Sequence, residues 1–341
     1  MNKMITIKDV AQKAKVSTAT VSRVINGNYP VSDQVRENVM ATIKELGYRP
    51  NVIARSLKCN KTYMVGMVVP DISNNYFMDI ARGVESVLSP LGYSLIFCST
   101  DENTEKELRL LNALNERRVD FVLLASSTQD SGKLKHFIDQ GMNIIMIDTK
   151  LDELQTDLVV EDNHNATYKL ISYVIGQGHQ RIGVVNGLMG VSTARERYEG
   201  FCQALTAHHI PIEPSYRVEG AFDRMTAYEE VKRMLQRNMH DLPTALFAAN
   251  NDMAEGTMMA LKEMGLRIPE DMSLVTFGDI NIPELIEPRL TIIAQNAGLI
   301  GQKAGELMIK RDNNTQEDRE YEKIIIPAEI IIRDSVKLMD H

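Results

Sequence analysis

From Tyr63 onward, short runs of apolar residues alternate with longer amphipathic segments, and this alternation constrains the fold more than any other feature. A short run that is apolar at every position predicts a strand buried on both faces, and helices between such strands predict βαβ units in a parallel sheet. The first series of predicted strands is Met64–Val69, Leu95–Cys98, Phe121–Leu124 and Ile144–Ile147, with helices near 78–88, 105–118 and 134–140.

The same alternation restarts near Arg181. Its predicted strands are Arg181–Val185, Ala245–Ala248 and Ser273–Phe277, with helices near 166–176, 193–207, 226–238 and 253–265. Two such series predict an α/β protein with two lobes, each a doubly wound parallel sheet. A small ligand is expected between the lobes, at the carboxyl ends of the strands.

The N-terminal residues predict a different, all-α unit. Residues 6–14 and 17–26 read as two short helices across a tight turn, with Thr6 and Ser17 as N-caps and Asp9 in the first turn. Two short helices in this arrangement form a helix-turn-helix, whose second helix enters the major groove of DNA. The alternative is an ordinary helical hairpin with a solvated polar face.

Helical spacing assigns roles to the polar face of the second helix. Arg23 can donate two hydrogen bonds to guanine, and Thr18 and Ala19 can contact a thymine methyl group. Short polar side chains suit contacts to phosphates, which fix register without reading sequence. The residues of this kind are Thr6, Ser17, Thr20, Ser22 and Asn26.

A third helix, with Ser32 as its predicted N-cap and Leu46 near its end, completes the N-terminal unit. Over residues 6–58 the chain closely resembles the headpiece and hinge of the LacI/GalR family of transcriptional regulators, and its headpiece is close to those of catabolite-control and purine-repressor members. The motifs that carry the resemblance are Ile7-Lys8-Asp9-Val10-Ala11, Val16-Ser17, Thr20-Val21-Ser22-Arg23-Val24, Ile25-Asn26-Gly27 and Tyr48-Arg49-Pro50-Asn51 followed by Ala54-Arg55-Ser56-Leu57.

The resemblance implies a domain plan and a DNA-binding mode. The headpiece is expected at 1–49, a hinge at 50–62 and an effector-binding and dimerisation domain of periplasmic-binding-protein type at 63–341. Within that domain, we expect an N-lobe at 63–162 and 295–326, a C-lobe at 163–292 and 327–341, and crossings near 162–164, 291–296 and 327. Ser32, Asn51, Ala54 and Arg55 join the expected DNA contacts, and Leu57 is the expected minor-groove wedge. The chain lacks a leucine heptad at its C-terminus, so a homodimer on a palindromic operator is expected.

The same resemblance implies a set of effector-binding residues. They are Asn75, Tyr76, Phe77, Asp148, Arg197, Phe222, Asn250, Asp279 and Gln295. Aromatic rings there would stack on a sugar, and Arg, Asn and Asp would bond its hydroxyl groups. The chain departs from the family where it has Asn251 and Gly278 in place of frequent aspartates. With Arg197 retained, and Arg195 and Arg224 expected near the cleft mouth, these departures predict an anionic effector, such as a sugar acid or sugar phosphate, that releases DNA.

Charge and composition fit this expectation. Residues 1–61 contain 11 Lys and Arg against 4 Asp and Glu, and the rest of the chain contains 27 against 42. A basic end on an acidic body is typical of a protein that docks on nucleic acid by that end. Cys59, Cys98 and Cys202 lack metal or disulfide spacing and read as reduced thiols. A cytoplasmic, nucleoid-associated protein is expected, without a metal, a cofactor or a membrane segment.

Three alternatives remain at this stage. An enzyme is possible on an α/β sheet, but the chain lacks a dinucleotide fingerprint, a P-loop and a nucleophile elbow. A periplasmic transport-binding protein would have a signal peptide and lack a basic headpiece. A catabolite-control regulator would take a phosphorylated carrier protein as corepressor, whereas Arg197 favours a small molecule.

Overall fold

The computed structural model describes residues 5–26, 30–48, 61–313 and 320–339. The chain divides into two compact units, residues 1–62 and residues 63–341. The first unit contains α1 (Ile7–Ala14), α2 (Thr18–Asn26) and α3 (Asp33–Leu46). Its small core consists of Val10, Ala11, Ala14, Val21 and Val39. The expected helix-turn-helix with a third helix is therefore present.

Caps fix where these helices begin and end. Thr6 and Asp9 form a capping box, in which the Thr6 backbone N–H donates to the Asp9 carboxylate over 2.8 Å. The Ser17 hydroxyl accepts from the Thr20 backbone N–H over 3.1 Å, which confirms the predicted cap of α2. Ser32 stands at the N-cap of α3 but makes no capping hydrogen bond through its side chain, so that part of the prediction is wrong. Gly47 ends α3 in the left-handed conformation.

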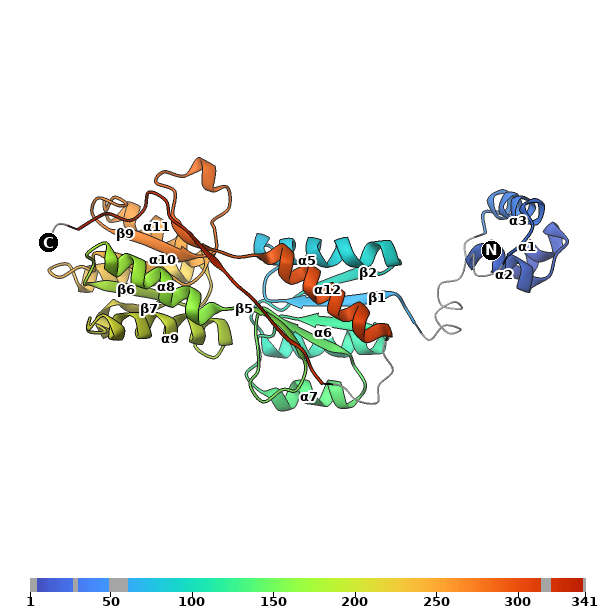
Figure 1. Cartoon of the computed structure of the whole chain (residues 1–341), viewed down its shortest axis with the longest axis horizontal. Coiled ribbons are helices and arrows are strands. Elements are labelled where there is room, and N and C mark those ends of the chain that lie inside the picture. Colours follow the sequence, from blue (N-terminus) through green and yellow to red (C-terminus); the bar gives the residue numbers. More distant parts are fainter. Residues whose placement is uncertain (1–4, 27–29, 49–60, 314–319, 340–341) are drawn as a thin grey trace. The chain divides into compact units, whose positions relative to one another are not determined.

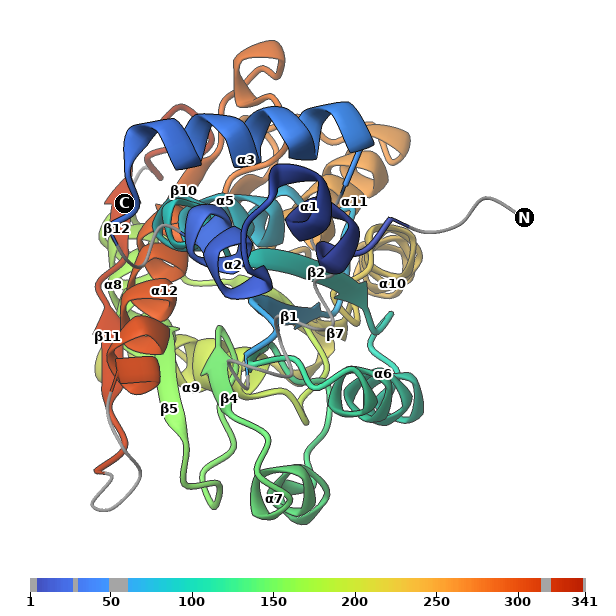
Figure 2. The same ribbon diagram turned by 90° about the vertical axis from the view of Figure 1, so that its right-hand side faces the viewer.

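The N-lobe is a six-stranded parallel sheet with strand order β11-β5-β4-β3-β1-β2. Its strands are β1 (Met64–Val69), β2 (Ser94–Ser99), β3 (Phe121–Leu124), β4 (Ile144–Ile147), β5 (Asp157–Glu161) and β11 (Lys323–Ile326). Its helices are α5 (Asn75–Leu88), α6 (Thr104–Glu116), α7 (Ser131–Asp139) and α12 (Ala297–Asn313), with a 3-10 turn η1 (Ser89–Leu91). Alternate residues of β1 enter two cores, one under α5 and α12 and the other under α6 and α7. Figure 2 shows α12 beside β11 and β5.

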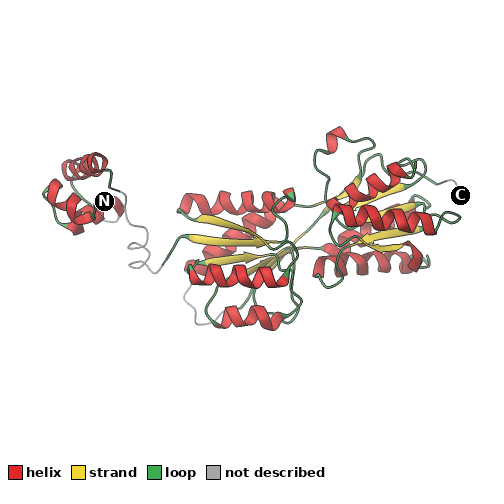
Figure 3. Cartoon of the chain, turned by 180° about the vertical axis from the view of Figure 1, so that it is seen from behind, coloured by secondary structure: helices red, strands yellow, loops and turns green. Residues whose placement is uncertain are grey.

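The C-lobe sheet has strand order β12-β10-β9-β8-β6-β7, and only β12 among the described strands runs antiparallel to its neighbour. Its strands are β6 (Ile182–Asn186), β7 (Arg217–Glu219), β8 (Ala245–Ala248), β9 (Ser273–Phe277), β10 (Thr291–Ala294) and β12 (Glu329–Ile331). Its helices are α8 (Asn163–Gly176), α9 (Ser192–Ala207), α10 (Arg224–Arg237) and α11 (Asn251–Glu263), with 3-10 turns η2 (Pro214–Tyr216) and η3 (Pro283–Leu285). Figure 3 shows helices on both faces of the strands in each lobe, which confirms the doubly wound α/β prediction.

Three crossings connect the lobes: after β5, between β10 and α12, and between β11 and β12. Figure 1 shows the last one as the dark red segment that runs from one lobe into the other. The segment 291–296, which the sequence indicated as a crossing, begins with strand β10 of the C-lobe, and the crossing follows it. Hydrogen bonds join the three crossings at one place, because Asp162 N–H donates to Ile326 O over 3.1 Å and Asn296 N–H donates to Glu161 over 3.0 Å.

Every helix within the described residues is too short or too polar to cross a membrane.

Candidate functional site

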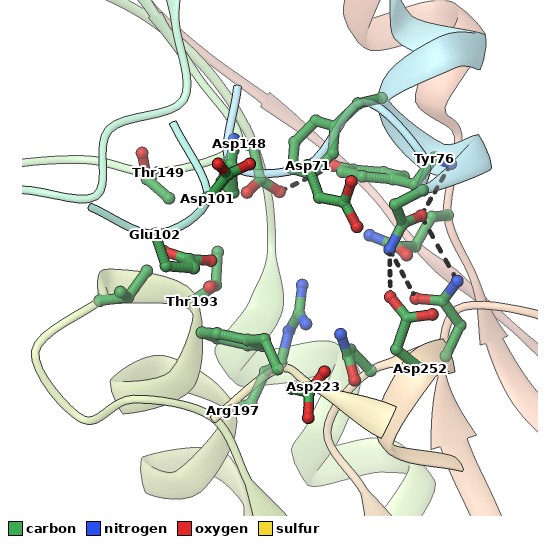
Figure 4. A pocket seen from close by; sticks show the side chains of 18 residues that line it. Asp71, Tyr76, Asp101, Glu102, Asp148, Thr149, Thr193, Arg197, Asp223 and Asp252 are labelled. Carbon is green, nitrogen blue, oxygen red and sulfur yellow. Dashed lines mark hydrogen bonds between the residues drawn. The ribbon is translucent and has the colours of Figure 1, made fainter. Parts of the chain in front are cut away.

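A cavity of about 330 Å³ lies between the two lobes, at the carboxyl ends of both sheets. From the N-lobe it is lined by the segments after β1, β2 and β4, and from the C-lobe by those after β6, β7 and β8 (Figure 4). Gln295 reaches it from the crossing between β10 and α12. This cavity, which we call the interlobe pocket, is the size of a small-molecule site.

The interlobe pocket brings together seven of the nine residues that the sequence predicted for the effector. They are Tyr76, Phe77, Asp148, Arg197, Phe222, Asn250 and Gln295. The structure places the other two in a neighbouring depression. Asn75 donates to Asn281 over 2.6 Å, and the Asp279 carboxylate is held by Arg333 over 2.6 Å. Neither of these two residues lines the interlobe pocket.

Arg197 on α9 is buried beneath the pocket, and its guanidinium points into it (Figure 4). Its Nε donates to Asn163 Oδ1 over 2.8 Å, and its Nη1 donates to Ala249 O over 2.6 Å. The guanidinium also lies over the Phe277 ring, 3.7 Å from the ring centroid. Burial lowers the pKa of Arg197, whereas Asp148 and Glu161 act to raise it. Since Nη2 makes no hydrogen bond within the described residues, it is available to a ligand.

Aromatic side chains stand on two sides of the pocket. Tyr76 and Phe77, at the start of α5, contact one another edge to face, and the Tyr76 hydroxyl donates to Asp148 over 2.8 Å. Phe222 comes from the C-lobe, and a Cβ at Gly187 would lie 2.2 Å from its ring, so only glycine leaves it room. Asp148 and Phe222 have φ values of 62° and 59°, which non-glycine residues rarely adopt outside functional or strained sites.

Gly278 lies beside Gln295, which lines the pocket. Gly278 has φ of +84°, and a Cβ there would lie 2.5 Å from Oε1 of Gln295. Nε2 of Gln295 donates to the buried Glu161 over 2.8 Å. The carboxamide oxygen of Gln295 therefore lies beside Gly278, the position at which the family often has an aspartate. Burial raises the pKa of Glu161 to about 7, although these hydrogen bonds and Arg197 oppose the shift.

The wall of the pocket is acidic, which the sequence analysis did not predict. Six carboxyl groups line it against the single guanidinium of Arg197, and these are Asp71, Asp101, Glu102, Asp148, Asp223 and Asp252. Burial raises the pKa of Glu102 to about 7 and that of Asp252 to about 6. Each of these residues lies within four positions of the end of a strand, which is a signal that the sequence contained.

The acidic wall disfavours the anionic effector that the sequence predicted, since ionised carboxyl groups repel an anion. The two extra arginines on which that expectation partly depended are engaged elsewhere. Arg195 pairs with Asp152 over 3.2 Å, and Arg224 pairs with Glu255 over 3.0 Å. Neither arginine lines the pocket.

In the N-terminal unit, α2 presents the predicted base-reading side chains to solvent. Thr18, Ala19 and Arg23 are exposed, as are Thr6, Ser17 and Ser32, whereas Thr20 and Ser22 are half-buried. Ser17 also bonds the Thr20 hydroxyl over 2.9 Å, so its oxygen is already engaged in the cap. Asn26 is the last residue of α2. The expected contacts Asn51, Ala54, Arg55 and Leu57 lie outside the described residues.

Both units of the chain match models of known protein families. Residues 6–51 match the model of bacterial regulatory proteins of the lacI family, and residues 62–334 match that of periplasmic binding proteins and the sugar binding domain of the LacI family. The HTH-type transcriptional repressor PurR of Haemophilus influenzae (strain PittEE) is 39% identical over 98% of this chain and 99% of that protein.

Two solved structures extend the likeness. The lac repressor dimer bound to operator and the anti-inducer ONPF is 26% identical with a TM-score of 0.84, covering 98% of this chain and 100% of that one. The complex of the transcriptional regulator CelR with cellobiose is 27% identical with a TM-score of 0.72, covering 97% and 99%.

Proposed function

Because the chain belongs to the LacI family of bacterial regulatory proteins, we propose that it acts in the cytoplasm as a homodimeric repressor that binds a palindromic operator and responds to a small molecule in the interlobe pocket. Its relatives and structural neighbours are transcriptional regulators and not enzymes, which confirms the expectation from the sequence. The observation that carries the proposal is that one chain has both a helix-turn-helix, whose α2 exposes Thr18, Ala19 and Arg23, and a pocket between two lobes.

The hinge completes the proposed DNA-binding mode. Leu57 of each subunit enters the minor groove at the centre of the operator and opens a pyrimidine–purine step, because such steps unstack most readily. This part of the proposal depends on the family resemblance, since residues 49–60 lie outside the described structure.

The chemistry of the pocket supports an uncharged or donor-rich ring as effector. Gln295 presents Oε1, Asp148 has an oxygen beyond the one that Tyr76 occupies, and Glu102 adds a further carboxyl group. These groups accept hydrogen bonds, so the ligand must donate them, as sugar hydroxyls and nucleobase N–H groups do. Phe222 and Tyr76 offer ring faces for stacking. The carboxyl groups of the pocket therefore favour such a ligand over the sugar acid or sugar phosphate that the sequence predicted.

The alternative is control by a phosphorylated carrier protein. A pocket of about 330 Å³ with Arg197 pointing into it favours a small molecule. A pull-down with the serine-phosphorylated carrier protein separates the two, since retention of the carrier would support the alternative.

The test of DNA recognition starts from selection of bound sequences from random double-stranded DNA, followed by titration of the selected site. We expect a palindrome, and Arg23→Ala should cost ~1–3 kcal/mol at one base pair of each half-site and relax specificity there. An equal loss on all sequences would assign Arg23 to phosphate binding. Selection that yields no preferred sequence would overturn the proposed function itself.

A further inference from the structure

We propose that the effector carries a protonated amine on its ring, recognised by the acidic wall around Asp71, Glu102 and Asp252. This inference rests on the proposed function, because it assigns a chemical class to the ligand of the interlobe pocket. The expected class is an amino sugar or another small amine-bearing ring.

The charge of the lining residues is the first observation. Six carboxyl groups and one guanidinium face a cavity of about 330 Å³, and Figure 4 shows Asp71, Asp101 and Glu102 from the N-lobe and Asp223 and Asp252 from the C-lobe around it. Like charges that share a low-dielectric cavity repel one another, and a cation placed among them relieves the repulsion.

Protein partners already satisfy part of this set. Asp101 bonds Lys106 over 2.5 Å, so its charge is compensated. Asp223 caps α10 by accepting from the Thr226 backbone N–H over 2.7 Å, at the positive end of the helix. The carboxylates of Asp101 and Asp223 are therefore stabilised by the protein itself, without a cationic ligand.

Of the other four carboxyl groups, Asp148 has the charge of Arg197 nearby. The remaining three, Asp71, Glu102 and Asp252, make hydrogen bonds only to neutral groups. Asp71 accepts from Ser73, whose backbone N–H lies 2.7 Å away. Asp252 accepts from the Asn74 amide over 2.8 Å, and Glu102 from the Ser127 hydroxyl. Asp71 raises the pKa of both Glu102 and Asp252 through its charge, which places it within electrostatic reach of each. None of these three carboxyl groups forms an ion pair within the described residues, although the charge of Arg224 acts to lower the pKa of Asp252.

Arg197 provides an independent sign that a ligand is bound here. It is only 4% exposed, and its Nη2 points into the pocket without a protein partner. A guanidinium N–H can donate a hydrogen bond to a ring oxygen or a hydroxyl group. A ligand with an oxygen toward Arg197 and an amine toward Asp71 matches both the free Nη2 of Arg197 and the acidic wall. An anionic ligand matches the arginine but not the acidic wall.

The experiment measures the preference of the full-length protein for an amine over its neutral counterpart at pH 7. The probes are D-glucosamine, D-galactosamine and D-mannosamine, each paired with its parent hexose and its N-acetyl derivative, in which the amine is replaced or made neutral. Thermal shift identifies the pair that stabilises the protein most, and calorimetry gives its two affinities. We expect the amine to bind at least about tenfold more tightly, the ratio that one favourable charge contact of about 1.4 kcal/mol produces.

Variants identify the carboxyl groups responsible. Asp71→Asn with Asp252→Asn should reduce the amine preference to about one while retaining the affinity for the neutral partner. Asp101→Asn is the matched control, because Lys106 already compensates that carboxylate, and it should leave the preference nearly unchanged. A variant that has lost its fold would also lose the neutral partner, which distinguishes the two causes.

Two results would overturn the inference. A neutral hexose that binds as tightly as its amine, or a panel in which no amine stabilises the protein, removes the cationic ligand. Operator selection and binding would still succeed in either case, so the proposed regulatory function would stand. Loss of operator selection would instead contradict the proposed function.

Discussion

Gln295 donates a hydrogen bond from Nε2 to Oε2 of Glu161 over 2.8 Å. The same carboxyl group accepts from the Asn296 backbone N–H over 3.0 Å. Because Glu161 ends β5 and Gln295 follows β10, this pair joins two of the three crossings between the lobes. It also fixes the Gln295 carboxamide so that Oε1 lies beside Gly278. Gln295, which lines the pocket, is thus hydrogen-bonded directly to the crossing that follows β5.

The first prediction concerns Gly278→Ala. The substitution should destabilise the protein twice over, since φ is +84° and the new Cβ would lie 2.5 Å from an oxygen that Glu161 holds in place. The backbone contribution is about 1–2 kcal/mol and the collision adds roughly 1 kcal/mol or more. Gly92→Ala is the matched control, with φ of +82° and open space around it. Urea unfolding of both variants measures the difference, and equal losses would show that Gln295 moves freely.

The second prediction is a pH dependence that depends on Glu161. Burial raises the pKa of Glu161 to about 7, so the folded protein retains a proton that the unfolded chain releases above about 4.5. The contribution of this group to stability should therefore fall as pH rises from about 4.5 to about 7. Glu161→Gln is neutral at every pH and should remove this dependence, by up to about 1.4 kcal/mol per pH unit.

Thermal and urea unfolding between pH 4.5 and 8 check this prediction. Glu105→Gln serves as the control, because the Glu105 side chain is 88% exposed and its loss should not change the slope. The same slope in the wild type and in Glu161→Gln would mean that Glu161 is ionised throughout the range.

Local sequence was sufficient for the strands whose every residue is apolar, such as β3 and β4. It was insufficient for β5, because Asp157 and Glu161 stand at its two ends and interrupt the apolar pattern. The fold places them there for distant partners: Asp157 forms a two-pronged ion pair with Arg311, and Glu161 accepts from Gln295. Edge strands β11 and β12 were also missed, since their side chains alternate between partial burial and exposure.

The site shows the same limit. The positions of Tyr76 and Arg197 in the pocket could be predicted, because each lies in a short sequence segment that resembles the family. Asp279 could not be excluded from the pocket, because the residue that holds its carboxylate, Arg333, lies 54 positions away in the chain. The acidic wall was missed for a related reason: its carboxyl groups come from separate segments, and only folding brings their charges into one cavity.

The third prediction concerns the start of α1. Thr6→Ala removes the capping box with Asp9 and should destabilise the headpiece by about 1 kcal/mol. Ser32→Ala is the matched control, because Ser32 holds the N-cap of α3 without a capping bond through its side chain and should cost little. Hydrogen exchange of the α1 and α3 amides in the full-length protein without DNA measures both. Equal protection in the two variants would contradict the role of the box.

The last prediction separates the two arginines of α9. Arg197 is held by three fixed contacts, to Asn163, to the Ala249 carbonyl and to the Phe277 ring. A lysine carries one compact ammonium group and cannot donate to both Asn163 Oδ1 and Ala249 O as the guanidinium does. Arg197→Lys therefore leaves at least one buried acceptor unsatisfied, which should destabilise the protein by about 1–3 kcal/mol. For a body of this size, the thermal midpoint should fall by roughly 2–4 °C per kcal/mol.

Arg195→Lys is the matched substitution two positions away. Its side chain is 36% exposed and pairs with Asp152 over 3.2 Å, an interaction that a lysine can largely replace. Exposed pairs contribute at most about 1 kcal/mol, so its midpoint should hardly change. Arg197→Lys should also weaken binding of the stabilising hexosamine, because the contact from Nη2 to a ligand oxygen is lost, whereas Arg195→Lys should not. Equal effects of the two substitutions on midpoint and affinity would show that Arg197 neither supports the pocket nor contacts its ligand.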